Sequence, residues 1–363
     1  MLTNDLEYIH KIMASEALSQ KESYQAFEAI VTGEMESIQL SALLTALKMK
    51  GETSEEIAGA ARALIDHAVA FPKPDYVTAD NCGTGGDGSN TINISTLCAI
   101  LAAACGVKMA KHGNRKVSSK SGSADVLSEL GIKLDMSPAH ARHCLDETNL
   151  TFLMAPVYHS GIRHAMPVRQ TLATRTIFNI LGPLVNPAEP AVKIVGVYSP
   201  DLCLPVAEAL KALGVASAWV VHGSGVDEIA LHGATQIAEL KKGEITEFEL
   251  TPETFGFNRQ PISALRGGTP TENAANIRQI LAGDGIDAHN AAVVMNTAPI
   301  LLLYGLAPDL TQACELAKSV LLSGKGLETL NTFVTLSHQP DESHQPDKSP
   351  RHNKSNSPSG DRS

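Results

Sequence analysis

Downstream of residues 71–74 (FPKP), short apolar segments alternate with helical patterns. The segments YVTADNC, GVKMAKHG, TFLMAPVY, KIVGVYS and SAWVVHG have the composition of strands, whereas TLCAILAAACG and SADVLSELG are typical of helices. Such alternation is typical of a mostly parallel sheet with helices on its faces. We therefore predict an α/β domain over residues 73–336, with ligands bound at the carboxyl ends of its strands.

The two ends of the chain differ from this domain. Residues 1–72 read as a small all-helical domain, in which Ser19 with Glu22 and Thr53 with Glu56 form capping boxes and Gly33 ends a helix. Residues 337–363 contain no aliphatic or aromatic residue and repeat the sequence SHQPD. This segment cannot bury enough surface to offset its ordering entropy, so we predict a disordered polar tail.

Charge and composition exclude several classes of protein. The net charge is −10, and the tail carries four acids and four bases, so the body is acidic and is a poor candidate for general nucleic-acid binding. No apolar run is long enough to span a bilayer, and the N-terminus does not resemble a signal peptide, which predicts a cytoplasmic protein without a membrane partner. The six cysteines form no CxxC pair and are expected to be reduced thiols.

A glycine-rich loop is expected between the first strand and the next helix. Residues 82–96, CGTGGDGSNTINIST, place four glycines within six residues, followed by hydroxyl and amide side chains. A strand–glycine loop–helix order exposes backbone N–H groups beside a positive helix end and therefore suits a phosphate or pyrophosphate. A tight turn with helix caps is an equally good reading of this loop alone. The match to GxGxxG is weak, because the acid expected about 20 residues later in a dinucleotide site is missing.

A second loop, residues 111–131 (KHGNRKVSSKSGSADVLSELG), follows the next predicted strand and should open at the same edge of the sheet. Lys111, Arg115, Lys116 and Lys120 concentrate positive charge in an acidic protein, which favours a multiply phosphorylated ligand over a solvated basic loop. Ser123 is expected to cap the following helix.

Two further motifs gain weight from these loops. Asp227 and Glu228 are adjacent acids, and they can serve one site only from a loop or bend, since side chains alternate along a strand. Beside a pyrophosphate they suggest Mg²⁺. Arg163, Arg169 and Arg175 are candidates to bind a carboxylate through a forked guanidinium.

Together, GTGGDGSNTINIST, KHGNRKVSSKSGSADVLSELG, RTIFNILGPLVNPA and HGSGVDEIA closely resemble the anthranilate phosphoribosyltransferase family over roughly residues 1–336. The resemblance implies a helical domain that also includes about residues 166–185, a homodimer through that domain, and transfer from phosphoribosyl pyrophosphate (PRPP) to anthranilate in tryptophan biosynthesis. The PRPP contacts that it implies are Gly83, Gly86, Asp87, Thr91, Asn93, Ile94, Ser95, Thr96, Lys111, His112, Gly113, Asn114, Arg115, Lys116, Val117, Ser118, Ser119 and Ser123.

The resemblance also implies the remaining ligands. Ser95 with Glu228 would hold one Mg²⁺ and Asp227 with Glu228 a second, and anthranilate would contact Gly83, Asn114 and Arg169, with His112 close by. No covalent protein nucleophile is expected, because an aryl amine is uncharged at neutral pH and can attack without a strong base. Ile92, Ser89 and the Ser224-Gly225-Val226 run depart from the common family pattern without removing a ligand.

Three alternatives remain open at this stage. A pyrimidine nucleoside phosphorylase would share the architecture but carry a different lysine- and serine-bearing phosphate motif. A non-catalytic nucleic-acid-binding relative should have a basic surface and a disrupted acid pair, neither of which this chain has. An NAD-dependent dehydrogenase is weakened by the missing acid.

Overall fold

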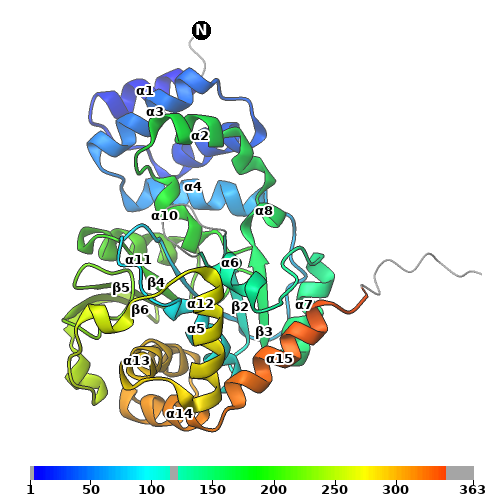
Figure 1. Cartoon of the computed structure of the whole chain (residues 1–363). Coiled ribbons are helices and arrows are strands. Elements are labelled where there is room, and N and C mark those ends of the chain that lie inside the picture. The colour runs from blue at the N-terminus through cyan, green and yellow to red at the C-terminus, as the bar shows by residue number, and fades with distance from the viewer. Residues whose placement is uncertain (1–3, 115–121, 341–363) are drawn as a thin grey trace, which may run out of the picture.

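A computed structural model describes residues 4–114 and 122–340 of the chain, which form a helical bundle beside a larger α/β body (Figure 1). The bundle contains α1 (Asn4–Met13), α2 (Gln20–Thr32), α3 (Ser37–Lys50) and α4 (Ser54–Asp66). The chain returns to the bundle after the third strand through α8 (Ala155–Tyr158), η1 (Ser160–His164), α9 (Met166–Leu172) and α10 (Phe178–Leu181). There η1 contacts α2, α9 contacts α3 and α10 contacts α4.

The helix ends of the bundle follow the local signals in the sequence. The Ser19 hydroxyl accepts a hydrogen bond from the Glu22 N–H, and the Glu22 carboxylate accepts one from the Ser19 N–H. Thr53 and Glu56 form the same reciprocal box at the start of α4. Gly33 ends α2 at φ 81°, a conformation that favours glycine. Both predicted capping boxes are therefore confirmed.

The α/β body is built on a seven-stranded sheet of order β3-β2-β1-β4-β5-β6-β7. The first five strands in chain order are parallel: β1 (Ala79–Gly83), β2 (Met109–Gly113), β3 (Leu150–Met154), β4 (Val192–Gly196) and β5 (Ser217–Gly223). An antiparallel hairpin, β6 (Thr235–Lys241) and β7 (Glu244–Leu250), completes one edge. The mostly parallel sheet is confirmed, and the hairpin is an addition that we did not predict.

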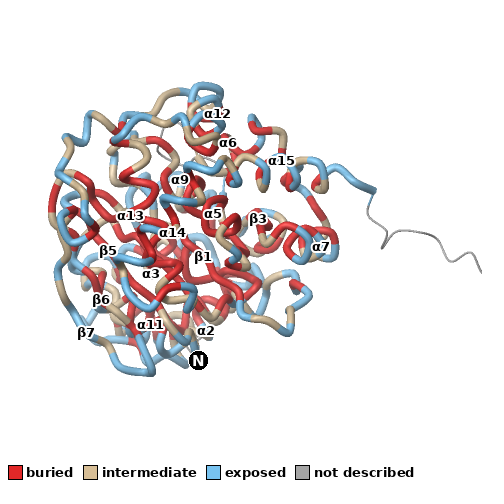
Figure 2. The backbone as a smooth tube through the Cα atoms, turned by 90° about the horizontal axis from the view of Figure 1, so that it is seen from below, coloured by how far each residue is buried: buried red, intermediate tan, exposed pale blue. Residues whose placement is uncertain are grey.

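Helices cover both faces of the sheet. On one face α5 (Ile94–Ala104) and α13 (Asp287–Tyr304) contact β1, and on the other α11 (Cys203–Ala212) contacts β5, β6 and the bundle helix α4. Alternate strand residues feed two cores: Ile194 packs with the first set of helices, and its neighbour Val195 packs with α11 and the bundle. The buried backbone accordingly runs through the centre of the molecule (Figure 2). The other elements are η2 (Gly182–Leu184), η3 (Pro200–Leu202), η4 (Pro252–Phe255), η5 (Ile262–Leu265), η6 (Ile280–Asp284), α6 (Ser123–Glu129), α7 (Pro138–Thr148), α12 (Pro270–Gln279), α14 (Leu310–Leu322) and α15 (Lys325–Ser337).

Two boundaries differ from the sequence expectations. The APVY part of TFLMAPVY forms α8 rather than strand, since Pro156 sits in the first turn of a helix, where its missing N–H costs nothing. Ser337, placed in the predicted tail, is the buried last residue of α15, and its hydroxyl accepts from the Lys133 N–H at 3.1 Å. The rest of the predicted tail, from residue 341, lies outside the described residues.

Within residues 4–114 and 122–340, no single helix is long and apolar enough to cross a membrane. The stretch Pro270–Asp284 and α13 reach that length and apolarity only together, and they meet at 85°.

Candidate active site

Four of the five parallel strands end in glycine at the same edge of the sheet: Gly83, Gly113, Gly196 and Gly223. The loop that follows β5 folds back over these ends. A Cβ on Gly83 would overlap Asp227 Oδ2, and one on Gly196 would overlap the Asp227 carbonyl oxygen. A side chain at either position would collide with Asp227. These glycines therefore allow the loop that carries Asp227 and Glu228, here called the acid loop, to pack directly against the strand ends.

The acid pair reaches the glycine-rich loop directly. Asp227 Oδ2 accepts a hydrogen bond from the Gly85 N–H at 2.7 Å. Glu228 Oε1 accepts from the Ser95 N–H at 3.2 Å and from the Ser95 hydroxyl. Both acids lie in a turn rather than in a strand, as predicted, and so both side chains can face one site. The two motifs, about 140 residues apart in sequence, are therefore one structural unit.

Burial makes these carboxylates hard to ionise. It is the main cause that raises the pKa of both Asp227 and Glu228. The neighbouring Asp87 raises the pKa of Asp227 further, and Asp227 does the same to Glu228. The Ser95 hydrogen bond and the Lys111 ammonium act in the opposite direction on the pKa of Glu228. Crowded buried carboxylates are stabilised by a proton or by a cation.

The donor set fits Mg²⁺. Two carboxylates and the Ser95 hydroxyl supply hard oxygen ligands, which Mg²⁺ prefers. No group of three His, Cys, Asp or Glu side chains that could hold a metal occurs in the described part of the chain. Ser95, Asp227 and Glu228 would supply only part of an octahedral shell, and such sites leave their other positions to water and substrate phosphate.

The glycine-rich loop has a conformation that requires glycine. Gly85 and Gly86 adopt φ values of +68° and +79°, and a Cβ on Gly85 would meet nothing within 4 Å. Thr91 forms an antiparallel bridge with Arg266, and the Ile92 N–H donates to the Leu265 carbonyl at 2.8 Å. The loop is thus open at its glycines and held at its end.

The next residues of this loop start α5. Asn93 Oδ1 accepts from Asn273 Nδ2 at 2.8 Å, a contact that no sequence pattern predicts. Ser95 faces Glu228, whereas Ile94 and Thr96 are 4% and 2% exposed. Their side chains lie in the core, so only their backbone groups are suited to bind a ligand at this position.

The second loop differs from the sequence expectation in its first two residues. We expected Lys111 and His112 at an open rim, but they are 4% and 3% exposed. Lys111 Nζ donates to the Asn81 carbonyl at 2.5 Å, beneath the acid pair. His112 Nδ1 lies 3.0 Å from the Gly182 carbonyl oxygen, so this nitrogen carries the proton. Burial is the main cause that lowers the pKa of His112, which keeps the imidazole neutral.

Beyond Gly113 the loop is described only in part. Asn114 is exposed, and Ala124 N–H and Ser123 Oγ both donate to its carbonyl oxygen at 3.3 Å. Gly122, not Ser123, is the N-cap of α6, so the predicted cap was wrong by one residue. The predicted PRPP contacts Arg115, Lys116, Val117, Ser118 and Ser119 lie outside the described residues, as does Lys120.

The three candidate arginines have separate positions. The Arg169 guanidinium, on α9, stacks 5.0 Å from the centre of the Phe178 ring, and burial lowers its pKa. Arg175 stacks at 4.3 Å on Tyr198 and donates to the Gly86 carbonyl, which joins the bundle side of the molecule to the glycine-rich loop. Arg163 is exposed on η1 and donates to the Ser160 carbonyl.

Sequence reasoning did not single out Gly196, Gly223 or Asn273. A signal for the glycines exists, because Gly223 closes the apolar segment SAWVVHG and Gly196 directly follows the apolar run Ile194-Val195. Asn273 has none, since its contact spans 180 positions.

Comparisons with known proteins agree along the chain. Residues 6–68 match the helical bundle domain of a glycosyl transferase family, and residues 75–327 match the α/β domain of such a family. A protein of Aeromonas salmonicida is 57% identical over 332 residues, covering 92% of this chain and 98% of that protein, and is named anthranilate phosphoribosyltransferase. A Vibrio cholerae protein of the same name is 57% identical over 317 residues, covering 87% of this chain and 95% of its own.

Solved structures give the same result. The anthranilate phosphoribosyltransferase of Thermus thermophilus superposes with a TM-score of 0.87 at 40% identity, covering 92% of this chain and 99% of that one. The enzyme of Saccharomyces cerevisiae, solved in complex with PRPP and Mg, superposes with a TM-score of 0.84 at 28% identity, covering 92% and 97%.

Proposed function

The chain belongs to the anthranilate phosphoribosyltransferase family, and we propose that it transfers the phosphoribosyl group of PRPP to the amine of anthranilate. The products are N-(5-phosphoribosyl)anthranilate and pyrophosphate, and the step belongs to tryptophan biosynthesis. The observation that carries the proposal is the contact between two motifs. Glu228 accepts a hydrogen bond from Ser95, and Asp227 accepts one from Gly85. A glycine-rich loop suited to phosphate and an acid pair therefore lie together at one edge of the sheet.

We assign the PRPP side of the site to the sheet. The loop around Gly86 and Gly88 and the start of α5 would receive the pyrophosphate, whereas the Gly85 and Ser95 N–H groups hold the acid pair. Ser95, Asp227 and Glu228 would hold Mg²⁺, and the two pairs that share Glu228 support two ions per site. Mg²⁺ bound there would neutralise charge that grows on the leaving pyrophosphate. The hydrogen bonds from Gly85 and Ser95 orient these ligands before substrate arrives.

We assign the anthranilate side to Gly83, Asn114 and Arg169. A guanidinium matches the planar carboxylate of anthranilate, and the partial burial of Arg169 strengthens such a pair. Holding both reactants in line supplies much of the rate enhancement. The neutral His112 is available as a hydrogen-bond acceptor at Nε2, which has no partner among the described residues. No covalent step on the protein is required.

We also propose that two copies associate through the bundle and that the enzyme acts in the cytoplasm. Ile38 and Met49 on α3 are 85% and 84% exposed, and Met13 on α1 is 67% exposed. Large apolar side chains gathered on one small domain favour a protein partner there. A second copy of the bundle offers the same apolar residues and so a self-complementary contact.

Anthranilate fluorescence tests the reaction. Purified protein with PRPP and Mg²⁺ is expected to consume anthranilate, and omission of any component or addition of EDTA is expected to stop the loss of signal. Phosphorolysis of uridine without consumption of anthranilate would reject the proposal.

A further inference from the structure

One short segment fastens the helical bundle to the α/β body. We call residues 182–186 (GPLVN), between α10 and β4, the domain-linking turn. Its apolar side chains, Leu184 and Val185, are 2% and 1% exposed and pack in the core shared with the bundle. Its polar groups are hydrogen-bonded by strands of the α/β body and by His159 of the segment that returns to the bundle. The turn therefore links the bundle core to the sheet.

Two side chains from strands of the sheet and one from the segment after α8 lie against three carbonyls of the domain-linking turn. His112 of β2 binds the Gly182 carbonyl, and His159, which follows α8, lies with Nε2 2.8 Å from the Val185 carbonyl oxygen. Between them, Lys193 Nζ donates to the Pro183 carbonyl at 2.9 Å. The Asn186 side chain donates to Asp80 Oδ2 at 2.9 Å and continues the row.

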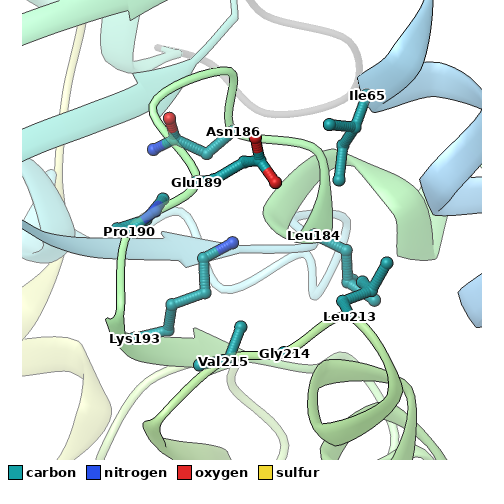
Figure 3. A pocket seen from close by; sticks show the side chains of 9 residues that line it. All are labelled: Ile65, Leu184, Asn186, Glu189, Pro190, Lys193, Leu213, Gly214 and Val215. Carbon is teal, nitrogen blue, oxygen red and sulfur yellow. The ribbon is translucent and has the colours of Figure 1, made fainter. Parts of the chain in front are cut away.

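Lys193 stands apart from the substrate loops. It lies near the start of β4, at the end opposite Gly196, and is 3% exposed. In Figure 3 its side chain extends from β4 toward the segment that carries Leu184 and Asn186. An ammonium group is costly to bury: burial lowers the pKa of Lys193, and the nearby Asp80 offsets part of that effect.

Packing beside Lys193 is incomplete. A cavity of about 30 Å³ lies between the bundle and the sheet, lined among others by Ile65, Leu184 and Lys193 (Figure 3). Apolar packing beside Lys193 is therefore incomplete. The hydrogen bond from Lys193 to the Pro183 carbonyl adds a directional constraint at this point to those made by His112, His159 and Asn186.

We propose that Lys193 is a positioning residue for the anthranilate side of the active site, an inference that rests on the proposed function. The glycine-rich loop follows β1 and is held by the bonds from Gly85 to Asp227 and from Ile92 to Leu265, and Arg175 contacts it from the bundle side. Arg169 belongs to the bundle side, and its guanidinium stacks on Phe178, four residues before Gly182. Loss of the bond from Lys193 to Pro183 would shift Arg169 relative to the sheet, whereas the bonds from Gly85 to Asp227 and from Ile92 to Leu265 would still hold the glycine-rich loop.

Steady-state kinetics of Lys193→Met tests the proposal, because methionine keeps most of the length of the side chain and removes the donor. We expect the KM for anthranilate to rise roughly tenfold while the KM for PRPP stays within about twofold. Lys193→Gln, which retains a donor, is expected to recover most of the change. Lys211→Met, on the exposed face of α11, is the matched control and should behave as wild type.

Leu330→Ala distinguishes a general loss of stability from a specific effect on anthranilate binding. It removes a buried side chain of α15, far from the turn, and should lower the Tm without changing the ratio of the two KM values. If Lys193→Met does not fold, Lys193→Arg is measured; its longer side chain should displace the Pro183 carbonyl and raise the anthranilate KM alone. An unchanged ratio of KM values in the folded Lys193 variant overturns the proposal, as does failure of glutamine to restore it. Inactive wild-type protein would instead reject the proposed function.

Discussion

Glu228 joins the acid loop to the glycine-rich loop through its carboxylate. It accepts from both the N–H and the hydroxyl of Ser95, and burial raises its pKa. Asp227 binds the glycine-rich loop through Gly85. At this scale the site is an anionic doublet held by backbone donors, which is suited to bind a cation only when both carboxylates are charged.

Glu228→Gln is expected to lower kcat/KM by about 100-fold or more, since it preserves shape and hydrogen bonding but removes the charge that holds Mg²⁺. The anthranilate fluorescence assay at several Mg²⁺ concentrations measures this loss. Glu247→Gln, on the exposed strand β7, is the matched control and should be neutral. Wild-type Mg²⁺ dependence in Glu228→Gln would remove Glu228 from the metal site.

Arg169→Ala is expected to raise the KM for anthranilate roughly tenfold or more, because it deletes a charge-assisted contact to a carboxylate. The KM for PRPP should change little. Equal changes in both constants would discredit the assignment of Arg169 to anthranilate.

At the scale of elements, helix ends and strands could be predicted from local sequence patterns, whereas contacts between distant parts of the chain could not. The capping boxes at Ser19 and Thr53 and the five parallel strands follow from patterns within a few residues. The hairpin β6–β7 was not predicted. Its outer strand lies at an edge of the sheet, where exposed residues are interspersed with half-buried ones, and so it has no apolar run that marks it in the sequence. The packing of the acid loop against Gly83 and Gly196 could be predicted only from the order of the strands in the sheet, and no local sequence pattern contains that order.

The burial of Lys111 and His112 has the same origin. Basic residues after a strand suggested an open rim, but both residues belong to the strand itself, and they bind carbonyls of Asn81 and Gly182 that arrive from elsewhere in the chain. The doublet Asp227–Glu228, in contrast, could be placed in a turn from sequence, because two adjacent acids cannot face one site from a strand.

Glu56→Gln is expected to lower the free energy of unfolding by about 3 kcal/mol, since Glu56 is buried and holds two elements together. Its carboxylate accepts from the Leu18 N–H at 3.0 Å and from Lys50 Nζ at 2.8 Å. Urea denaturation measures the change. Glu55→Gln, at the exposed neighbouring position of α4, is the control, and equal stability of the two variants would contradict this role.

At the scale of the whole molecule, the pair Asp227 and Glu228 makes part of the folding free energy depend on pH. The pKa of each acid is higher in the folded than in the unfolded protein, so without metal the folded state binds more protons. The contribution of this pair to stability is then fully present below the ordinary carboxyl pKa of about 4 and is lost as pH rises through the raised values. Mg²⁺ competes with these protons and stabilises only the charged pair.

Addition of Mg²⁺ is therefore expected to raise the Tm more at about pH 8 than at about pH 6. Differential scanning fluorimetry with and without Mg²⁺ measures the two shifts. Glu228→Gln should lose most of the difference between them, and an identical shift at both pH values in wild type would contradict the linkage.

Association of whole molecules is tested at α3. Ile38→Glu is expected to convert a dimer to a monomer, because it places a charge in the centre of an apolar contact. Sedimentation velocity measures the state. Leu322→Glu, at a 54% exposed position on α14, should leave the dimer intact, and a monomeric wild-type protein would reject association through the bundle.

A crystal structure of the protein with PRPP, in which Mn²⁺ replaces Mg²⁺ and is located by its anomalous scattering, probes the proposed site without intermediate steps. We predict density for the pyrophosphate over residues 83–88, and metal peaks bound by Ser95, Asp227 and Glu228. Metal and sugar found at another place in the molecule, with these three side chains free of both, would contradict the proposed site.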